Sequence, residues 1–145
     1  MIKFLSKFPF FSYLQPFELE FISQLMVEIN IEKGDVLFNE GDPGDAVYFI
    51  LEGALEVVKI SDFGDVSIIA TLAQGNAIGE MSLIDSKARS ATTRALVRTK
   101  LVKLSKRMFD KTVSAAPKVG VALLKGLVAA VSDNLRLTSA QLSNQ

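Results

Sequence analysis

The chain has 145 residues, and its 16 basic and 16 acidic side chains give a formal net charge of zero, so charge does not favour nucleic acid. It lacks histidine and cysteine, which excludes Ser-His-Asp triads, thiol nucleophiles, disulfides and histidine or thiolate metal sites. Because 49% of the residues are apolar, we expect one folded domain with a substantial core, and no enzymatic function.

The first segment, residues 1–27, is expected to be helical. Gln15-Pro16 marks a helix start, because proline is favoured at the first helical position. Phe17, Phe21 and Leu25 recur at four-residue intervals, which is typical of one buried helix face.

The middle segment, residues 28–105, changes to short apolar runs separated by turn residues. Residues 61–65, with the sequence SDFGD, predict a hairpin loop between two of these runs. Many short strands around one core indicate a sandwich or jelly-roll. The clearest predicted strands are residues 36–38, 47–51, 55–60, 66–72, 90–97 and 101–104.

The most informative stretch is GEMSLIDSKARSATTRA, residues 79–95. Gly79 lets the backbone approach a ligand closely, and the short turn after it exposes backbone N–H groups. Arg89 can donate to two phosphate oxygens, and Glu80 can accept from a sugar hydroxyl. An acid for ribose and an arginine for phosphate together suggest a nucleotide.

This stretch resembles the phosphate-binding cassette of the cyclic nucleotide-binding domain family, which includes the bacterial catabolite activator protein. Two departures stand out: Ser82 replaces the usual Gly or Ala, and Ala88 stands where many members carry Pro. The glycine-punctuated strands of residues 33–53 resemble the family as well. The residues that match the cassette in register are Gly79, Glu80, Met81, Leu83, Arg89, Ser90, Ala91 and Thr92.

The resemblance implies a mainly β fold with flanking helices. The expected fold is an antiparallel jelly-roll (double-stranded β-helix) barrel over residues 28–105, with the cassette at 79–92. Residues 106–145 would form C-terminal helices, and the whole chain, 1–145, one cyclic nucleotide-binding domain.

The family's ligand contacts then predict the site. Glu80 would accept from the ribose 2′-OH, Arg89 and Ser90 would hold the cyclic phosphate, and backbone N–H groups of residues 81–83 would complete the pocket. Because Ala91 and its neighbours read as interior, we expect Arg89 to be buried, satisfied by a bound phosphate or, in an empty site, partly by Glu80 or water. No catalytic residue, metal or cofactor is expected. The predicted ligand-binding residues are Gly79, Glu80, Met81, Ser82, Leu83, Arg89, Ser90, Ala91, Thr138 and Ser139.

Two helices are expected at the C-terminal end of the chain, one capped by Ser105 and one opened by Pro117. The second carries an apolar stripe that either covers the barrel's open side or pairs with a second copy, as in the catabolite activator protein. Thr138 and Ser139 resemble the pair that contacts the purine in that protein; alternatively they belong to a fraying terminus. The stripe consists of Leu124, Leu127, Val128, Val131 and Leu135.

Two functions follow from the resemblance. The first is a cytoplasmic cyclic-nucleotide sensor that binds cAMP, with cGMP as the second candidate, and signals by moving its last helix. The alternative is a ligand-independent interaction or dimerisation module. In either case we expect the partner to be a homodimer copy or a separate effector protein.

About eight residues follow Leu137, too few for a DNA-reading helix-turn-helix, so no DNA-binding domain is expected. The apolar runs are too short to span a membrane, which takes about 20 residues.

Overall fold

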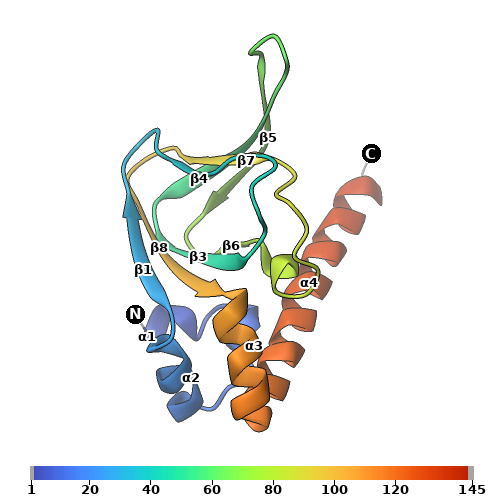
Figure 1. Cartoon of the computed structure of the whole chain (residues 1–145). Coiled ribbons are helices and arrows are strands. Elements are labelled where there is room, and N and C mark those ends of the chain that lie inside the picture. Colours follow the sequence, from blue (N-terminus) through green and yellow to red (C-terminus); the bar gives the residue numbers. More distant parts are fainter. Residues whose placement is uncertain (1, 144–145) are drawn as a thin grey trace.

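The computed structural model describes the backbone of residues 2–143 and the side chains of residues 2–135. Apart from the short η2 between β6 and β7, the helical segments lie before and after the strands in the chain and gather at one end of the barrel, from which the last helix runs along the barrel's side (Figure 1). Among the described residues, no helix has the length and apolarity needed to cross a bilayer. The helical elements are α1 (Ile2–Leu5), η1 (Pro9–Phe11), α2 (Pro16–Ser23), η2 (Glu80–Leu83), α3 (Lys106–Ala115) and α4 (Pro117–Ser143).

Two antiparallel sheets of four strands each face one another. Their strand orders are β1-β8-β3-β6 and β2-β7-β4-β5. The arrangement confirms the predicted fold class, a jelly-roll barrel with flanking helices, and the β4–β5 hairpin projects beyond the rest of it (Figure 1). The strands are β1 (Val27–Ile31), β2 (Val36–Phe38), β3 (Ala46–Glu52), β4 (Ala54–Ile60), β5 (Val66–Ala73), β6 (Ala77–Ile78), β7 (Thr92–Ala95) and β8 (Thr99–Ser105).

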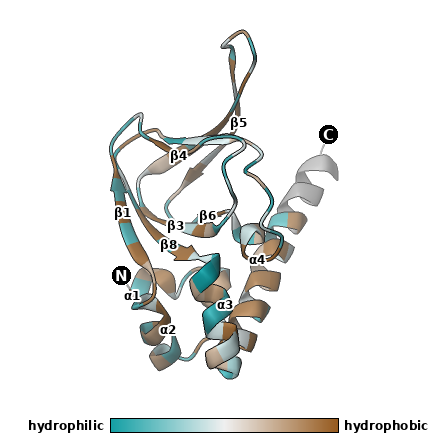
Figure 2. Cartoon of the chain, viewed as in Figure 1, coloured by the Kyte–Doolittle hydropathy of each residue, from teal (hydrophilic) through white to brown (hydrophobic). Residues whose placement is uncertain are grey.

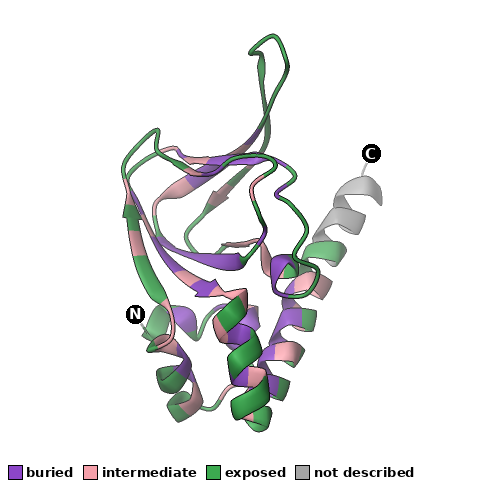
Figure 3. Cartoon of the chain, in the orientation of Figure 1, coloured by how far each residue is buried: buried purple, intermediate pink, exposed green. Residues whose placement is uncertain are grey.

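Strand β3 separates two hydrophobic clusters, which explains its continuous apolar sequence. Six of its seven residues are buried, as Figure 3 shows along the strand. Because side chains alternate along a strand, Tyr48 and Ile50 lie in the cluster between the sheets, whereas Val47 and Phe49 lie in the cluster under the helices. Phe49 packs against three phenylalanines that precede α2, with ring centroids 4.8–5.3 Å apart.

Local sequence signals place the helices. Pro16 is at the first turn of α2, where the Gln15 backbone N–H donates to the Glu18 carboxylate at 2.8 Å. Ser105 caps α3 by accepting from the Met108 N–H at 3.1 Å, which confirms the predicted cap. In α4, Gly126 packs directly on the backbone of η1: a Cβ at this position would overlap the Phe10 carbonyl.

The predicted strand at residues 90–97 is too long. Strand β7 covers only Thr92–Ala95, because these are the residues that pair with β4, and on its N-terminal side the backbone of Arg89 bonds to a loop. The Arg89 N–H donates to the Asp42 carbonyl, and the Arg89 carbonyl accepts from the Gly41 N–H, both at 2.8 Å. Strands β1 and β6 were absent from the predicted set.

The apolar stripe of α4 does not form a single face. Leu127 is buried, and Leu124 and Val131 pack against the same cluster, so this part covers the helical end of the core. Val128 and Leu135, by contrast, are 67% and 62% exposed. The helix is therefore apolar over much of its circumference, as its largely brown ribbon in Figure 2 shows, and only one side of it is buried.

Candidate functional site

The cassette begins with a left-handed glycine that brings backbone close to an arginine. Gly79 follows β6, has a φ of 88° and precedes the short helix η2. A Cβ at this position would overlap Nη1 of Arg89 and lie 3.0 Å from the Ala46 carbonyl oxygen. Glycine is thus required both for the backbone conformation and for the space that the guanidinium occupies.

The Arg89 side chain is buried, with 7% of its surface exposed. Its Nη1 donates to the Ser82 hydroxyl at 2.9 Å, and its Nη2 donates to the Ala46 carbonyl at 2.8 Å. Of the two partners expected for this arginine in an empty site, Glu80 or water, Glu80 is not one, because a serine hydroxyl and a main-chain carbonyl are the acceptors. Buried Nε has no hydrogen-bond partner.

The electrostatic surroundings of Arg89 do not neutralise it. None of the ion pairs among the described residues includes this guanidinium. Burial lowers its pKa, and Tyr48, Asp45 and Asp42 oppose that shift. The guanidinium carbon also lies 4.3 Å from the centre of the Phe38 ring, a cation–π contact. The result is a cation whose direct hydrogen-bond acceptors are neutral, with Nε–H and the second N–H of each Nη nitrogen not paired within the described residues.

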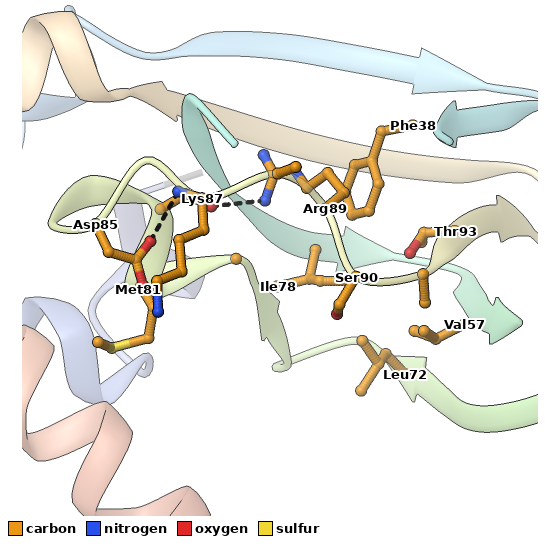
Figure 4. Close-up of a pocket in the computed structure, with 14 residues that line it drawn as sticks. Phe38, Val57, Leu72, Ile78, Met81, Asp85, Lys87, Arg89, Ser90 and Thr93 are labelled. Atoms are coloured by element: carbon orange, nitrogen blue, oxygen red, sulfur yellow. Dashed lines mark hydrogen bonds between the residues drawn. The ribbon is translucent and has the colours of Figure 1, made fainter. Parts of the chain in front are cut away.

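Arg89 lines a cavity of about 420 Å³, here called the arginine pocket. Figure 4 shows it with Arg89 and Phe38 at one side and the side chains of Ile78, Leu72 and Val57 along another. It is therefore polar at the guanidinium and apolar beyond it. Its lining comprises Phe38, Val57, Leu72, Ile78, Gly79, Met81, Ser82, Asp85, Lys87, Ala88, Arg89, Ser90, Ala91 and Thr93.

The structure brings most of the predicted residues to this pocket. Leu83 is different: it is buried in the cluster under the helices, so any part it plays in binding falls to its backbone. The side chains of Thr138 and Ser139 lie outside the described residues. The predicted residues that line the arginine pocket are Gly79, Met81, Ser82, Arg89, Ser90 and Ala91.

Glu80 does not line the arginine pocket. It lines a neighbouring cavity of about 510 Å³, the Glu80 depression, together with Ala130, Asp133 and Asn134 of α4. Leu72 borders both cavities. Burial raises the pKa of Glu80, and a hydrogen bond from its own backbone N–H opposes the shift.

Several pocket residues were not predicted from the sequence. Phe38 reaches Arg89 because β2 pairs with β7, a contact that no local pattern indicates. Thr93 could have been predicted from the sequence. It lies two residues after Ala91 and four residues after Arg89, and in an extended segment this spacing places all three on the same inward face.

Comparison with known proteins agrees with this geometry. A model of the "Cyclic nucleotide-binding domain" family matches residues 28–115. The chain is 36% identical over 108 residues to a cAMP-dependent protein kinase regulatory subunit from Blastocladiella emersonii, a match that covers 74% of this chain but 27% of that protein.

Solved structures give the same result. A cyclic nucleotide-binding domain from Methylobacillus flagellatus superimposes with a TM-score of 0.81 at 28% identity, covering 91% of this chain and 75% of that one. The regulatory subunit of a cAMP-independent protein kinase A from Trypanosoma brucei gives 0.69 at 27% identity, covering 86% and 44%. The arginine pocket is formed largely by residues of the predicted cassette, and the family model matches more than half of the chain. The chain therefore belongs to the cyclic nucleotide-binding domain family.

Proposed function

We propose that this chain binds cAMP in the arginine pocket, with the cyclic phosphate against Arg89, and signals by moving α4. The observation that carries the proposal is the burial of Arg89, a residue only 7% exposed. Its guanidinium forms no ion pair within the described part of the chain, and its Nε has no hydrogen-bond partner there. Burying a cation that makes no direct ion pair is costly even with Asp45 and Asp42 nearby, so the site favours an anion. A cyclic phosphate supplies that anion and accepts from a planar guanidinium fork.

The remainder of the pocket suits a nucleoside. Val57, Leu72 and Ile78 give it an apolar wall against which a purine ring can pack. Ser90 is exposed at the pocket, where its hydroxyl can donate to a phosphate oxygen. A free inorganic anion would use the guanidinium and leave the apolar wall unused.

The role proposed for Glu80 requires a movement. Glu80 lines the Glu80 depression and not the arginine pocket, so its carboxylate must turn toward the arginine pocket to accept from the ribose 2′-OH. Because burial already disfavours the charged carboxylate, a sugar hydroxyl donating to it would replace lost hydration.

The proposed preference for cAMP over cGMP has two supports. The family resemblance implies threonine at the position of Ser90 in many members that favour cGMP, and a matched relative is a cAMP-dependent protein kinase regulatory subunit. We infer that cAMP binds more tightly and that cGMP is the second ligand.

The helix η2 provides a mechanical link from the pocket to α4. Its Met81 and Ser82 line the arginine pocket, while its Leu83 packs in one buried cluster with Leu123 and Leu127 of α4. A ligand that shifts η2 therefore alters the packing of α4. Such coupling typically amounts to about 1–3 kcal/mol.

The outward face of α4, where Val128 and Leu135 are exposed, would then meet a second copy or a separate effector. Light scattering over a concentration series, with and without cAMP, distinguishes these. A mass that doubles with concentration indicates a homodimer, and a constant monomer mass indicates a separate effector.

A second candidate is an interaction module that works without a nucleotide. Two donor groups of Arg89 already have acceptors within the chain, and one relative of known structure is the regulatory subunit of a cAMP-independent kinase. This alternative predicts a folded protein that takes up neither nucleotide.

Calorimetric titration with cAMP and cGMP separates the two candidates. We expect wild type to bind, Arg89→Ala to lose about 100-fold or more in affinity because two charge-assisted hydrogen bonds are lost, and Arg89→Lys to recover only part of it. Glu80→Ala should lose a smaller but substantial part. The control is Arg98→Ala, since the Arg98 side chain is 76% exposed and should not matter. No heat and no thermal shift with either nucleotide would establish the second candidate.

A further inference from the structure

Thr93 carries the second buried polar atom that lacks a partner. Its side chain is 0% exposed, and its hydroxyl makes no hydrogen bond. Among the described side chains, the only other such atom is Nε of Arg89, and both residues line the arginine pocket. Buried hydroxyls are almost always hydrogen-bonded to protein or water, so two buried polar atoms without a protein partner in one cavity are candidate contacts for the polar groups of a ligand.

The strand register fixes where the Thr93 hydroxyl points. Thr93 is paired with Phe38 on β2 and with Val57 on β4, and these two neighbours line the same pocket. In Figure 4 its oxygen faces the cavity between them. The hydroxyl therefore lies in the apolar part of the pocket, four residues along the chain from Arg89, and not in the part that would hold phosphate.

Thr92 shows that an unpartnered hydroxyl is not a general property of β7. The Thr92 side chain is also buried, but its hydroxyl accepts from the Glu40 N–H at 3.0 Å. Thr99 and Thr112 are likewise buried and bonded to backbone carbonyls. Only the threonine aimed into the pocket is left without a partner among these four.

We propose that the Thr93 hydroxyl forms a hydrogen bond with the heterocyclic base of the bound nucleotide. The inference rests on the proposed function, because it assigns the base to the apolar part of the pocket once the phosphate lies on Arg89. A hydroxyl both donates and accepts, so it can pair with a ring nitrogen, an amino group or a carbonyl of the base. Thr93 is thus a specificity-determining residue: it favours ligands that carry a base over a bare sugar phosphate.

The test measures by calorimetry how tightly two probes bind to matched variants. The affinity of the weaker probe is obtained from its competition with the tighter one. One probe is the tighter-binding of cAMP and cGMP, and the other is methyl ribofuranoside 3′,5′-cyclic phosphate, which has no base. Thr93→Val keeps the side-chain shape without the hydroxyl, and Thr93→Ser keeps the hydroxyl. Thr112→Val makes the same change at a buried threonine on α3, whose hydroxyl donates to the Met108 carbonyl at 2.8 Å.

We expect Thr93→Val to weaken binding of the cyclic nucleotide about 3- to 10-fold, as for one neutral hydrogen bond, and to leave the base-free probe unchanged. Thr93→Ser should stay near wild type. Without ligand, Thr93→Val should melt no lower than wild type, since it removes an unsatisfied group, whereas Thr112→Val should melt lower and bind both probes normally.

Three results would overturn the inference. Equal nucleotide affinity in wild type and Thr93→Val would show that Thr93 forms no hydrogen bond with the base, and it would leave the proposed function intact. Equal weakening of both probes would show a general distortion of the pocket. Failure of wild type to bind either nucleotide would overturn the inference together with the proposed function.

Discussion

Replacing Gly79 by alanine disturbs the arginine pocket without changing any charge. The new Cβ would overlap Nη1 of Arg89, whose hydrogen bond to Ser82 would then break or lengthen. Gly34 provides a matched control: its φ is also 88°, yet a Cβ there meets nothing within 4 Å. The pair separates the cost of the left-handed backbone from the cost of displacing the guanidinium.

The magnitudes follow from these contacts. A left-handed non-glycine residue costs about 1–2 kcal/mol, so Gly34→Ala should lower the free energy of unfolding by that amount. In Gly79→Ala the same cost adds to the loss of a hydrogen bond to a charged group, worth about 1.5–3 kcal/mol. We therefore expect a loss of about 2.5–5 kcal/mol for Gly79→Ala.

Urea denaturation gives the free energy of unfolding of both variants, and calorimetry gives their affinities for cAMP. Gly34→Ala should bind like wild type, whereas Gly79→Ala should bind at least tenfold more weakly because Arg89 is displaced. If the two variants lose equal stability and retain equal affinity, the guanidinium does not depend on the space at Gly79, and the description of the site is wrong.

Three further predictions concern single side chains. Ser82→Ala should lower the free energy of unfolding by about 1–3 kcal/mol, because Nη1 of Arg89 loses its acceptor. The same variant should bind cAMP more tightly, because the phosphate no longer competes with the Ser82 hydroxyl for Nη1. Weaker binding of cAMP would contradict this. Burial raises the pKa of Glu80 above 4.5, so its contribution to stability is present below pH 4.5 and is lost as pH rises through the raised pKa. The stability of wild type relative to Glu80→Gln, measured in urea, should therefore fall across that range, and a flat difference would refute it. Ser105→Ala should cost about 1 kcal/mol through the lost cap of α3 and leave nucleotide binding unchanged, which chemical denaturation and calorimetry check.

The sequence was sufficient for features that depend on local pattern. Alternation and turn residues indicated the sheets, Pro16 and Ser105 marked helix starts, and the cassette spacing indicated a buried Arg89. Each of these follows from a few neighbouring residues, so no knowledge of the tertiary structure is needed.

Other features depend on contacts between distant segments. The Ser82–Arg89 hydrogen bond depends on how η2 folds back over the pocket, and the Phe38–Arg89 contact on the pairing of β2 with β7. Glu80 lies toward α4 because that helix supplies the other wall of the Glu80 depression. Likewise, the split of the α4 stripe between buried and exposed residues is decided by where the helix docks, which periodicity alone does not specify.

The central claim is that the unpaired Nε–H of Arg89 donates to the cyclic phosphate. The most direct test follows the ¹⁵N–¹H resonance of the Arg89 Nε–H group, which is assigned by its absence in Arg89→Lys. The protein is titrated with cAMP and, separately, with uncharged adenosine. We predict a downfield proton shift that saturates with cAMP and does not occur with adenosine, because only the phosphate accepts from Nε. A resonance that stays in place at saturating cAMP would contradict the account.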